Sequence, residues 1–159
     1  MPTGASATSD ATAFESFYRE QYDNTARLAW FLTRGSFDYE DIAQDSLFKV
    51  RDRFSTLDKP GAYLRAVVVN ACNERHRRMD RERARLRLVA PSELVLTPSD
   101  AGLLDALRRL PYDQRAVIVL RYWADLSDDD IAAALGVRPS TVRTRVHRAL
   151  KVLNKEIER

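Results

Sequence analysis

Residues 127–150, SDDDIAAALGVRPSTVRTRVHRAL, contain the strongest structural pattern in the chain. Ser127 can cap a helix because its hydroxyl can accept from first-turn amides, and three aspartates follow it at the positive end of the helix dipole. Gly136 suits the left-handed residue that ends a helix, and Pro139 suits the first turn of the next one. The stretch therefore predicts two helices joined by a short turn.

The second of these helices has one apolar stripe. At about 100° per residue, the residues on that stripe are Val142, Val146, Ala149 and Leu153. We expect the stripe to pack on Ile131 and Leu135 of the preceding helix. Two helices packed in this way form a helix-turn-helix, a motif whose second helix enters the major groove of DNA.

The opposite side of the second helix carries hydrogen-bond donors suited to bases and phosphates. Those expected to contact bases, because they lie in the part that enters the groove, are Ser140, Thr141, Thr144 and Arg148. Those expected to hold phosphates are Arg143, Arg145 and Lys151. The alternative is a solvated basic helix at the end of an α-helical domain, because arginine is a good helix former and charged faces are usually wet.

The composition favours an all-α protein of one ordinary domain or two small ones. The chain has 159 residues, only five glycines and few alternating apolar stretches. No segment approaches the roughly 20 apolar residues of a membrane span, and the first residues lack the basic and apolar blocks of a signal peptide. We therefore expect a cytoplasmic protein.

The sequence offers little chemistry to an enzyme. Cys72 is the only cysteine, and one thiol forms neither an internal disulfide nor a cysteine-rich zinc site, so we expect a small buried side chain. His76 and His147 lie among arginines, without acidic partners at metal-ligand spacing. No nucleophile with its base and no glycine-rich phosphate loop stands out. We expect no enzymatic activity, no cofactor and no metal.

Charge alternates along the chain in four blocks. Residues 1–58 carry 6 basic and 10 acidic side chains, and residues 59–89 carry 9 and 3. Residues 90–137 then carry 4 and 8, and residues 138–159 carry 7 and 2. Each half of the chain therefore ends in a basic segment that could bind a polyanion.

Residues 90–99, APSELVLTPS, are typical of a linker because they contain two prolines and no basic residue. The simplest partition has a disordered tail over residues 1–12 and a helical domain over residues 13–89. After the linker, a second small helical domain spans residues 100–159.

Two helices are predicted early in the first domain. Apolar residues recur at three- and four-residue steps from Ala13 to about Thr33, which predicts a helix or a closely jointed pair that ends at Gly35. A second helix should run from about Asp38 to Phe54. Its expected buried residues are Ile42, Ser46, Leu47, Val50 and Phe54.

The other face of this second helix carries an unusual aromatic residue. Phe48 lies there among polar and acidic side chains, which are Asp41, Gln44, Asp45 and Asp52. A single exposed apolar residue is common and needs no explanation. The sharper interpretation is a protein-docking face, in which an aromatic anchor is surrounded by charges that select a basic partner.

A long third helix is predicted from Pro60, after a loop at residues 55–59. Its first turns should bury Leu64, Val67, Val68 and Ala71. Its second half holds seven arginines among residues 75–87, which is dense for ordinary surface. Upstream, Tyr63 and Asn70 lie near one exposed edge, where a ring and an amide suit unpaired bases. Core packing for Tyr63 and a plain surface amide for Asn70 are equally compatible with the pattern.

Taken in order, three segments resemble a bacterial RNA polymerase sigma factor of the small extracytoplasmic-function (ECF) group of the sigma-70 family. DIAQDSLFKV (41–50) is similar to the family's core-polymerase-binding helix, and AYLRAVVVNACNERHRR (62–78) to its helix for the minus-10 promoter element. Residues 107–150 are similar to its domain for the minus-35 element. The resemblance covers nearly everything after Ala13. It implies a region 2 helical bundle and a region 4 helix-turn-helix joined by a short linker.

The resemblance also implies three sets of contacts. Those with the clamp helices of the polymerase β′ subunit are made by Asp41, Gln44, Asp45 and Phe48. The second set contacts the minus-10 strand, and its residues are Phe54, Lys59, Tyr63, Asn70, Arg75, Arg77 and Arg78. In this set, the Ser55 to Gly61 loop and Asn70 would hold a flipped base. Those with the minus-35 duplex are made by Ser140, Thr141, Arg143, Thr144, Arg145, His147 and Arg148.

Two residues depart from the family's pattern. Tyr63 stands where many members carry Trp, and Arg138 stands where a Ser often caps the recognition helix. The departures concern the aromatic residue used in promoter melting and the start of the recognition helix.

The implied function is promoter-specific transcription initiation by a subunit of core RNA polymerase, with β′ and β contacts, promoter DNA, and an anti-sigma factor as a further partner. Two alternatives stay open. One is a helix-turn-helix regulator that binds operators without the polymerase, and the other is an adaptor whose arginine-rich helix binds RNA or another protein.

Overall fold

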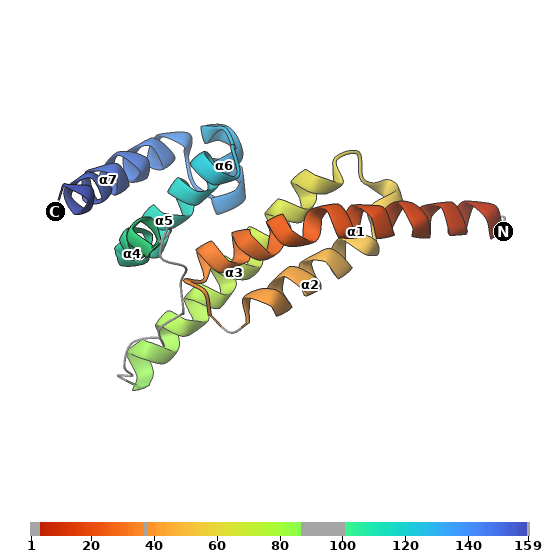
Figure 1. The fold of residues 1–159 in the computed structure, drawn as a ribbon, viewed down its shortest axis with the longest axis horizontal. Helices are drawn as coiled ribbons and strands as arrows, with labels where there is room; N and C mark the ends of the chain where they lie inside the picture. The colour runs from red at the N-terminus through yellow and green to blue at the C-terminus, as the bar shows by residue number, and fades with distance from the viewer. Residues whose placement is uncertain (1–3, 37, 87–100, 159) are drawn as a thin grey trace. The chain divides into compact units, whose positions relative to one another are not determined.

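The computed structural model describes residues 4–36, 38–86 and 101–158. They are helical and contain no strand, which confirms the all-α prediction (Figure 1). No helix among them is long and apolar enough to cross a membrane. The chain divides into two compact units, Met1–Cys72 and Asn73–Arg159.

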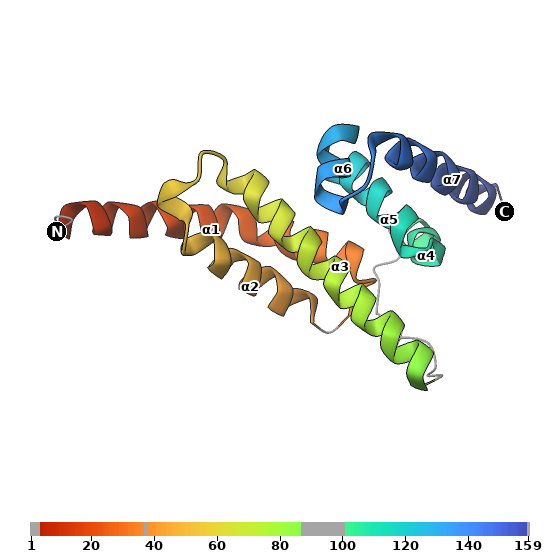
Figure 2. The ribbon, with the colours of Figure 1, turned by 180° about the vertical axis from the view of Figure 1, so that it is seen from behind.

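The first unit is built on two helices that run side by side, α1 (Gly4–Leu32) and α2 (Tyr39–Arg51) (Figures 1 and 2). A 3₁₀ turn, η1 (Phe54–Thr56), follows, and α3 (Pro60–Leu86) begins in this unit. The buried apolar side chains are Leu28, Ala29, Leu32, Ala43, Leu47, Val50, Leu64, Val68, Val69 and Cys72. The prediction of a buried Cys72 is confirmed.

The expected disordered tail over residues 1–12 is wrong for residues 4–12, because α1 begins at Gly4. The segment contains several alanines, which favour a helix more than any other residue, and Thr12 donates to the carbonyl of Thr8 at 2.9 Å. Described side chains before Phe14 are exposed, so this extension of the helix buries no core.

The second helix is shorter than expected. It ends at Arg51 rather than near Phe54, and the amide of Arg53 donates to the carbonyl of Val50 in a tightened last turn. Phe54 leaves the helix and packs its ring against Phe14 and Phe17, at centroid distances of 5.5 and 5.3 Å. It is therefore only half-buried, as is Ile42, which we also expected in the core.

The third helix buries a slightly different set from the one expected. Leu64 and Val68 are buried as predicted, whereas Val67 and Ala71 are half-buried. Val69 is buried instead, one position further along, so the buried stripe is turned slightly around the helix.

In the second unit, α4 (Ala101–Arg109) is followed by α5 (Tyr112–Ile118) and a π-helical turn, η2 (Val119–Trp123). Then come α6 (Asp128–Leu135) and α7 (Pro139–Ile157), which packs on α4, α5 and α6 (Figure 1).

Every local signal expected of the helix-turn-helix is present. The Ser127 hydroxyl accepts from the amide of Asp130 at 3.1 Å, and Gly136 ends α6 with φ 66°. Pro139 begins α7, although Arg138 before it caps the helix with no side-chain bond. The predicted apolar stripe is buried throughout, and so is Ile131 of α6, whereas Leu135 is half-buried.

The boundary between the compact units lies inside α3, earlier than the partition expected from the sequence. The second half of α3 belongs with α5, because Asn73 and His76 both contact Tyr112. The expected linker, residues 90–99, lies outside the described residues.

Candidate protein-docking and nucleic-acid interfaces

The exposed face of α2 carries the residues that the sequence assigned to protein docking. Phe48 is 44% exposed, and the polar side chains expected around it, Asp41, Gln44, Asp45 and Asp52, are exposed as well. The face therefore presents a hydrophobic ring and several carboxylates to solvent.

Phe48 is part of a larger aromatic surface than the sequence indicated. Its ring lies 6.4 Å from that of Tyr18 on α1, and Tyr18 stacks on Tyr22 at 5.7 Å. The guanidinium of Arg51 lies over the Phe48 ring, at 5.1 Å from the ring centroid. The steps of four residues from Phe14 to Tyr18 and Tyr22 were a usable signal for this surface, since they place the three rings along one side of a helix.

One pKa shift lies at the start of α2. The Tyr39 hydroxyl donates to the Glu40 carboxylate at 3.0 Å, and this hydrogen bond raises the pKa of Tyr39 above its ordinary value. The Glu40 carboxylate also lies, with that of Asp41, in the first turn of the helix. Acidic charge at this position complements the helix dipole.

The residues expected at the minus-10 site differ in exposure. Lys59 is exposed in the loop before α3. Tyr63 is half-buried, and the guanidinium of Arg53 lies 5.5 Å from its ring centroid, so one face of the ring is already occupied. Phe54 belongs to the aromatic cluster with Phe14 described above.

Asn70 is exposed on α3 and has the access that an unpaired base would need. Tyr63 precedes it by seven residues, which places both on one side of the helix at about 10 Å separation. Among the arginines, Arg77 and Arg78 are exposed and Arg75 is half-buried. Helical spacing therefore aligns the ring, the amide and Arg77 along α3.

The third candidate interface is a groove in the second unit. It has a volume of about 430 Å³ and lies between the start of α5 and the first half of α7. Its lining from α7 is Ser140, Thr141, Thr144, Arg145 and Arg148, and its lining from α5 and the preceding residue is Pro111, Asp113 and Gln114. The four expected base-contacting residues thus share one concave surface.

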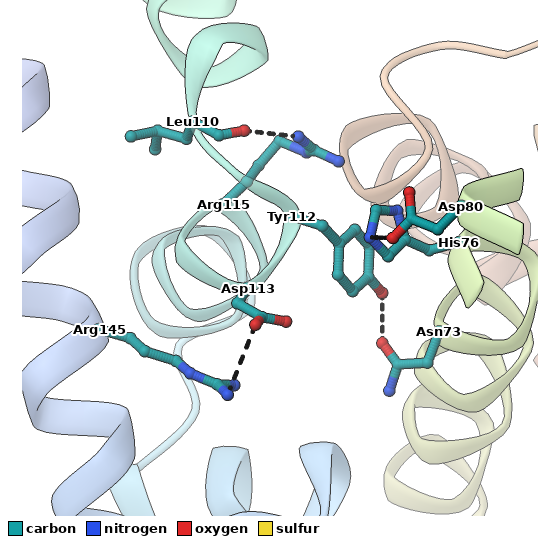
Figure 3. Close-up of polar contacts among 8 residues, drawn as sticks. All are labelled: Asn73, His76, Asp80, Leu110, Tyr112, Asp113, Arg115 and Arg145. Carbon is teal, nitrogen blue, oxygen red and sulfur yellow. Dashed lines mark hydrogen bonds and ion pairs between the residues drawn. The ribbon is translucent and has the colours of Figure 1, made fainter. Parts of the chain in front are cut away.

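Two groove residues have a more specific geometry than helical spacing predicts. The Thr144 hydroxyl donates to the carbonyl of Ser140 at 3.0 Å, so its methyl group and its acceptor lone pairs remain available to a ligand in the groove. Arg145 forms an ion pair with Asp113, with 3.6 Å between Nη2 and Oδ2 (Figure 3). Arg143, His147 and Lys151 are exposed on α7 outside the groove lining.

Figure 3 also shows contacts around Tyr112 that the sequence did not reveal. Its ring stacks on His76, and its hydroxyl donates to the Asn73 carboxamide oxygen. Asp80 is an acidic partner that we did not expect for His76, at 3.0 Å from Nε2. The buried Arg115 donates to the carbonyl of Leu110 at 3.1 Å and lies 5.5 Å from the Tyr112 ring centroid.

The sequence matches known proteins along most of its length. Residues 101–153 match the family described as sigma-70, region 4. The RNA polymerase sigma-E factor of Streptomyces coelicolor is 33% identical over 156 residues, which cover 91% of this chain and 85% of that protein. The ECF RNA polymerase sigma factor SigM of Mycobacterium tuberculosis is 32% identical over 151 residues, covering 88% of this chain and 74% of that protein.

Two solved structures share the fold. One is the sigma factor RpoE in complex with the anti-sigma factor NepR from Bartonella quintana, with a TM-score of 0.77, 23% identity, and coverage of 92% of this chain and 97% of that one. The other is CnrH in complex with the cytosolic domain of CnrY, with a TM-score of 0.65, 23% identity, and coverage of 93% and 89%.

The helices α6 and α7 form a helix-turn-helix, and the second of them is basic. These features place the chain in the class of helix-turn-helix proteins. The relatives give the narrower assignment, because their similarity covers 91% and 88% of this chain. The chain belongs to the ECF group of the sigma-70 family of RNA polymerase sigma factors.

Proposed function

We propose that this sigma factor binds core RNA polymerase through α2 and directs promoter-specific initiation through two DNA-binding surfaces, one on α3 and one on α7. The observation that carries the proposal is the groove of about 430 Å³ along the recognition helix, lined by four side chains that the sequence alone assigned to base contacts. A groove lined by these donors suits a duplex promoter element.

The docking role of α2 is supported by its exposed chemistry. A half-exposed phenylalanine ring among carboxylates offers a hydrophobic anchor and a charge pattern that favours a basic partner. We infer that Asp41, Gln44, Asp45 and Phe48 contact the β′ clamp helices, and that the β subunit contributes further contacts.

The minus-10 role of α3 is supported by the exposed Asn70 amide and the basic second half of the helix. We infer that Asn70 and the loop before α3 hold a base extruded from the non-template strand, and that Arg75, Arg77 and Arg78 bind the backbone nearby. Holding an extruded base stabilises a melted state that otherwise lies a few kcal/mol uphill. Binding at the minus-35 duplex supplies an anchor on the same DNA, so the second contact benefits from a high effective concentration.

On this account the protein acts by binding, and the polymerase performs the chemistry of RNA synthesis. It works in the cytoplasm, where promoter DNA and polymerase meet. We also propose an anti-sigma factor as a partner, because the RpoE structure that shares this fold holds one. A regulator that covers α2 or the α7 groove would prevent initiation without any change in the sigma factor's fold.

Run-off transcription with purified core polymerase and genomic fragments tests the proposal. We expect discrete transcripts only when the full chain is added, and mapped start sites that share two upstream elements. Tight binding to a symmetric operator in the absence of polymerase, with no transcript, would instead identify an ordinary helix-turn-helix regulator.

A further inference from the structure

We propose that Asp113 is a positioning residue that holds Arg145 in the groove of the second unit, so that Arg145 contacts a base rather than a phosphate. The inference rests on the proposed function, in which this groove receives the minus-35 duplex. It changes the role expected for Arg145 from the sequence and adds a specificity determinant from α5.

The geometry brings the two side chains together from different helices. Asp113 lies in the first turn of α5, and its Oδ2 is 3.6 Å from Nη2 of Arg145 on α7. Both residues line the groove together with Arg148 (Figure 3 shows the pair). The Arg145 side chain is only 23% exposed, whereas that of Asp113 is 63% exposed, so the arginine is the more buried of the two.

A carboxylate is out of place in a surface that only grips phosphates, because it repels the DNA backbone. Its presence in the groove lining is explained if it fixes the orientation of a guanidinium. Arginine carries five N–H donors in a rigid planar fork, so one edge can face a carboxylate while another is offered to a ligand. A guanidinium fixed in this way can present two parallel donors to the O6 and N7 acceptors of guanine.

Arg143 provides the internal comparison. It lies on the same helix, is exposed, and forms no ion pair within the described residues. A long unrestrained arginine suits a phosphate contact, since the backbone offers many equivalent oxygens. Arg145 is already paired with Asp113 in the free protein, and a side chain restrained before binding contacts a base at a lower entropic cost.

The test is DNA selection with the polymerase holoenzyme on promoters randomised across the upstream element. The variants are Asp113→Ala, Asp113→Glu, Arg145→Ala and Arg143→Ala, with a double variant of Asp113→Ala and Arg145→Ala. We expect Asp113→Ala and Arg145→Ala to lose preference at the same base pair, each by about tenfold, as for one lost bidentate contact. The double variant should be no worse than Arg145→Ala, Asp113→Glu should retain part of the preference, and Arg143→Ala should keep all of it.

The opposite result is equally recognisable. If Asp113 merely repels DNA, Asp113→Ala will keep the base preference and bind every sequence more tightly, which would overturn the proposal. The same selection is repeated with the full chain alone on duplex fragments. If the wild-type chain fails to join the polymerase, but Asp113→Ala and Arg145→Ala still lose preference at the same base pair on duplex fragments, the proposed function is overturned and the role of Asp113 is supported. Because Asp113 is largely exposed, its variants are expected to unfold at the wild-type temperature.

Discussion

The ring of Tyr112 on α5 stacks on the imidazole of His76 on α3, with centroids 4.2 Å apart and ring planes 13° from parallel (Figure 3). The Tyr112 hydroxyl also donates to Asn73, one turn before His76. Within the second compact unit, this tyrosine therefore attaches the second half of α3 to the helices that follow residue 100.

Tyr112→Phe keeps the stacked ring and removes only the hydroxyl. We expect a loss of about 0.5–1.5 kcal/mol in the free energy of unfolding, the usual net contribution of one hydrogen bond. Tyr122→Phe is the matched control, because Tyr122 is 60% exposed, and should change stability by less than about 0.5 kcal/mol. Urea denaturation followed by circular dichroism measures both. Equal stability of the two variants would show that the bond to Asn73 contributes nothing.

Two glycine-to-alanine substitutions should change the stability of the fold in opposite directions. Gly136 ends α6 at φ 66°, and a Cβ there would meet no atom within 4 Å, so Gly136→Ala should destabilise through backbone strain alone, by about 1 kcal/mol. Gly102 lies within α4, also with nothing within 4 Å of its Cβ position, so Gly102→Ala should stabilise by up to about 1 kcal/mol. Thermal unfolding of both variants checks the signs, and a stabilising Gly136→Ala would contradict the left-handed cap.

Alanine substitutions of Arg148 and Arg143 should weaken DNA binding in different ways. Arg148 lines the groove, so Arg148→Ala should weaken binding to the preferred minus-35 sequence by about 1–3 kcal/mol and relax preference at one position. Arg143→Ala should weaken binding on all sequences and lower the salt slope by about one. Titrations of holoenzyme on matched and altered promoters at several salt concentrations separate the two. A uniform loss for Arg148→Ala would reject base contact by this residue.

Asn70→Ala should impair the melting of promoter DNA rather than the binding of the sigma factor to the polymerase. If Asn70 captures an extruded base, transcription from duplex promoters should fall much further than transcription from a template melted in advance across the minus-10 region. Asn24→Ala, which removes an exposed amide from α1, is the control and should leave both rates unchanged. An equal fall in transcription from both templates would show that the Asn70 side chain does not act by capturing a base.

The helix-turn-helix was predictable nearly residue by residue because each of its signals is local. Ser127 caps α6 through the amide three residues ahead, Gly136 ends it through its own φ, and the buried stripe of α7 follows the helical period. The exposed Phe48 was predictable for the same reason, since one helical wheel separates it from the core.

Most structural features that could not be predicted from the sequence depend on contacts between distant segments. The pairing of Arg145 with Asp113 and the stacking of Tyr112 on His76 join different helices, and no periodicity encodes which helices meet. Phe54 fitted the apolar pattern of α2 but packs with α1 instead. The helix over residues 4–12 was missed because it has no apolar stripe, so alanine content was its only signal.

The central claim is that α2 recruits the polymerase while other surfaces hold DNA, and the affinity of the full chain for core polymerase tests it most directly. The measurement compares the wild type with Phe48→Ala and Asp45→Arg, and Glu20→Arg on α1 controls for a reversed surface charge. We expect nanomolar-range binding by the wild type and the control, and a loss of at least about 2 kcal/mol for both α2 variants, as for interface hot spots. Unchanged affinity of Phe48→Ala and Asp45→Arg, or a wild-type chain that never joins the polymerase, would contradict the account.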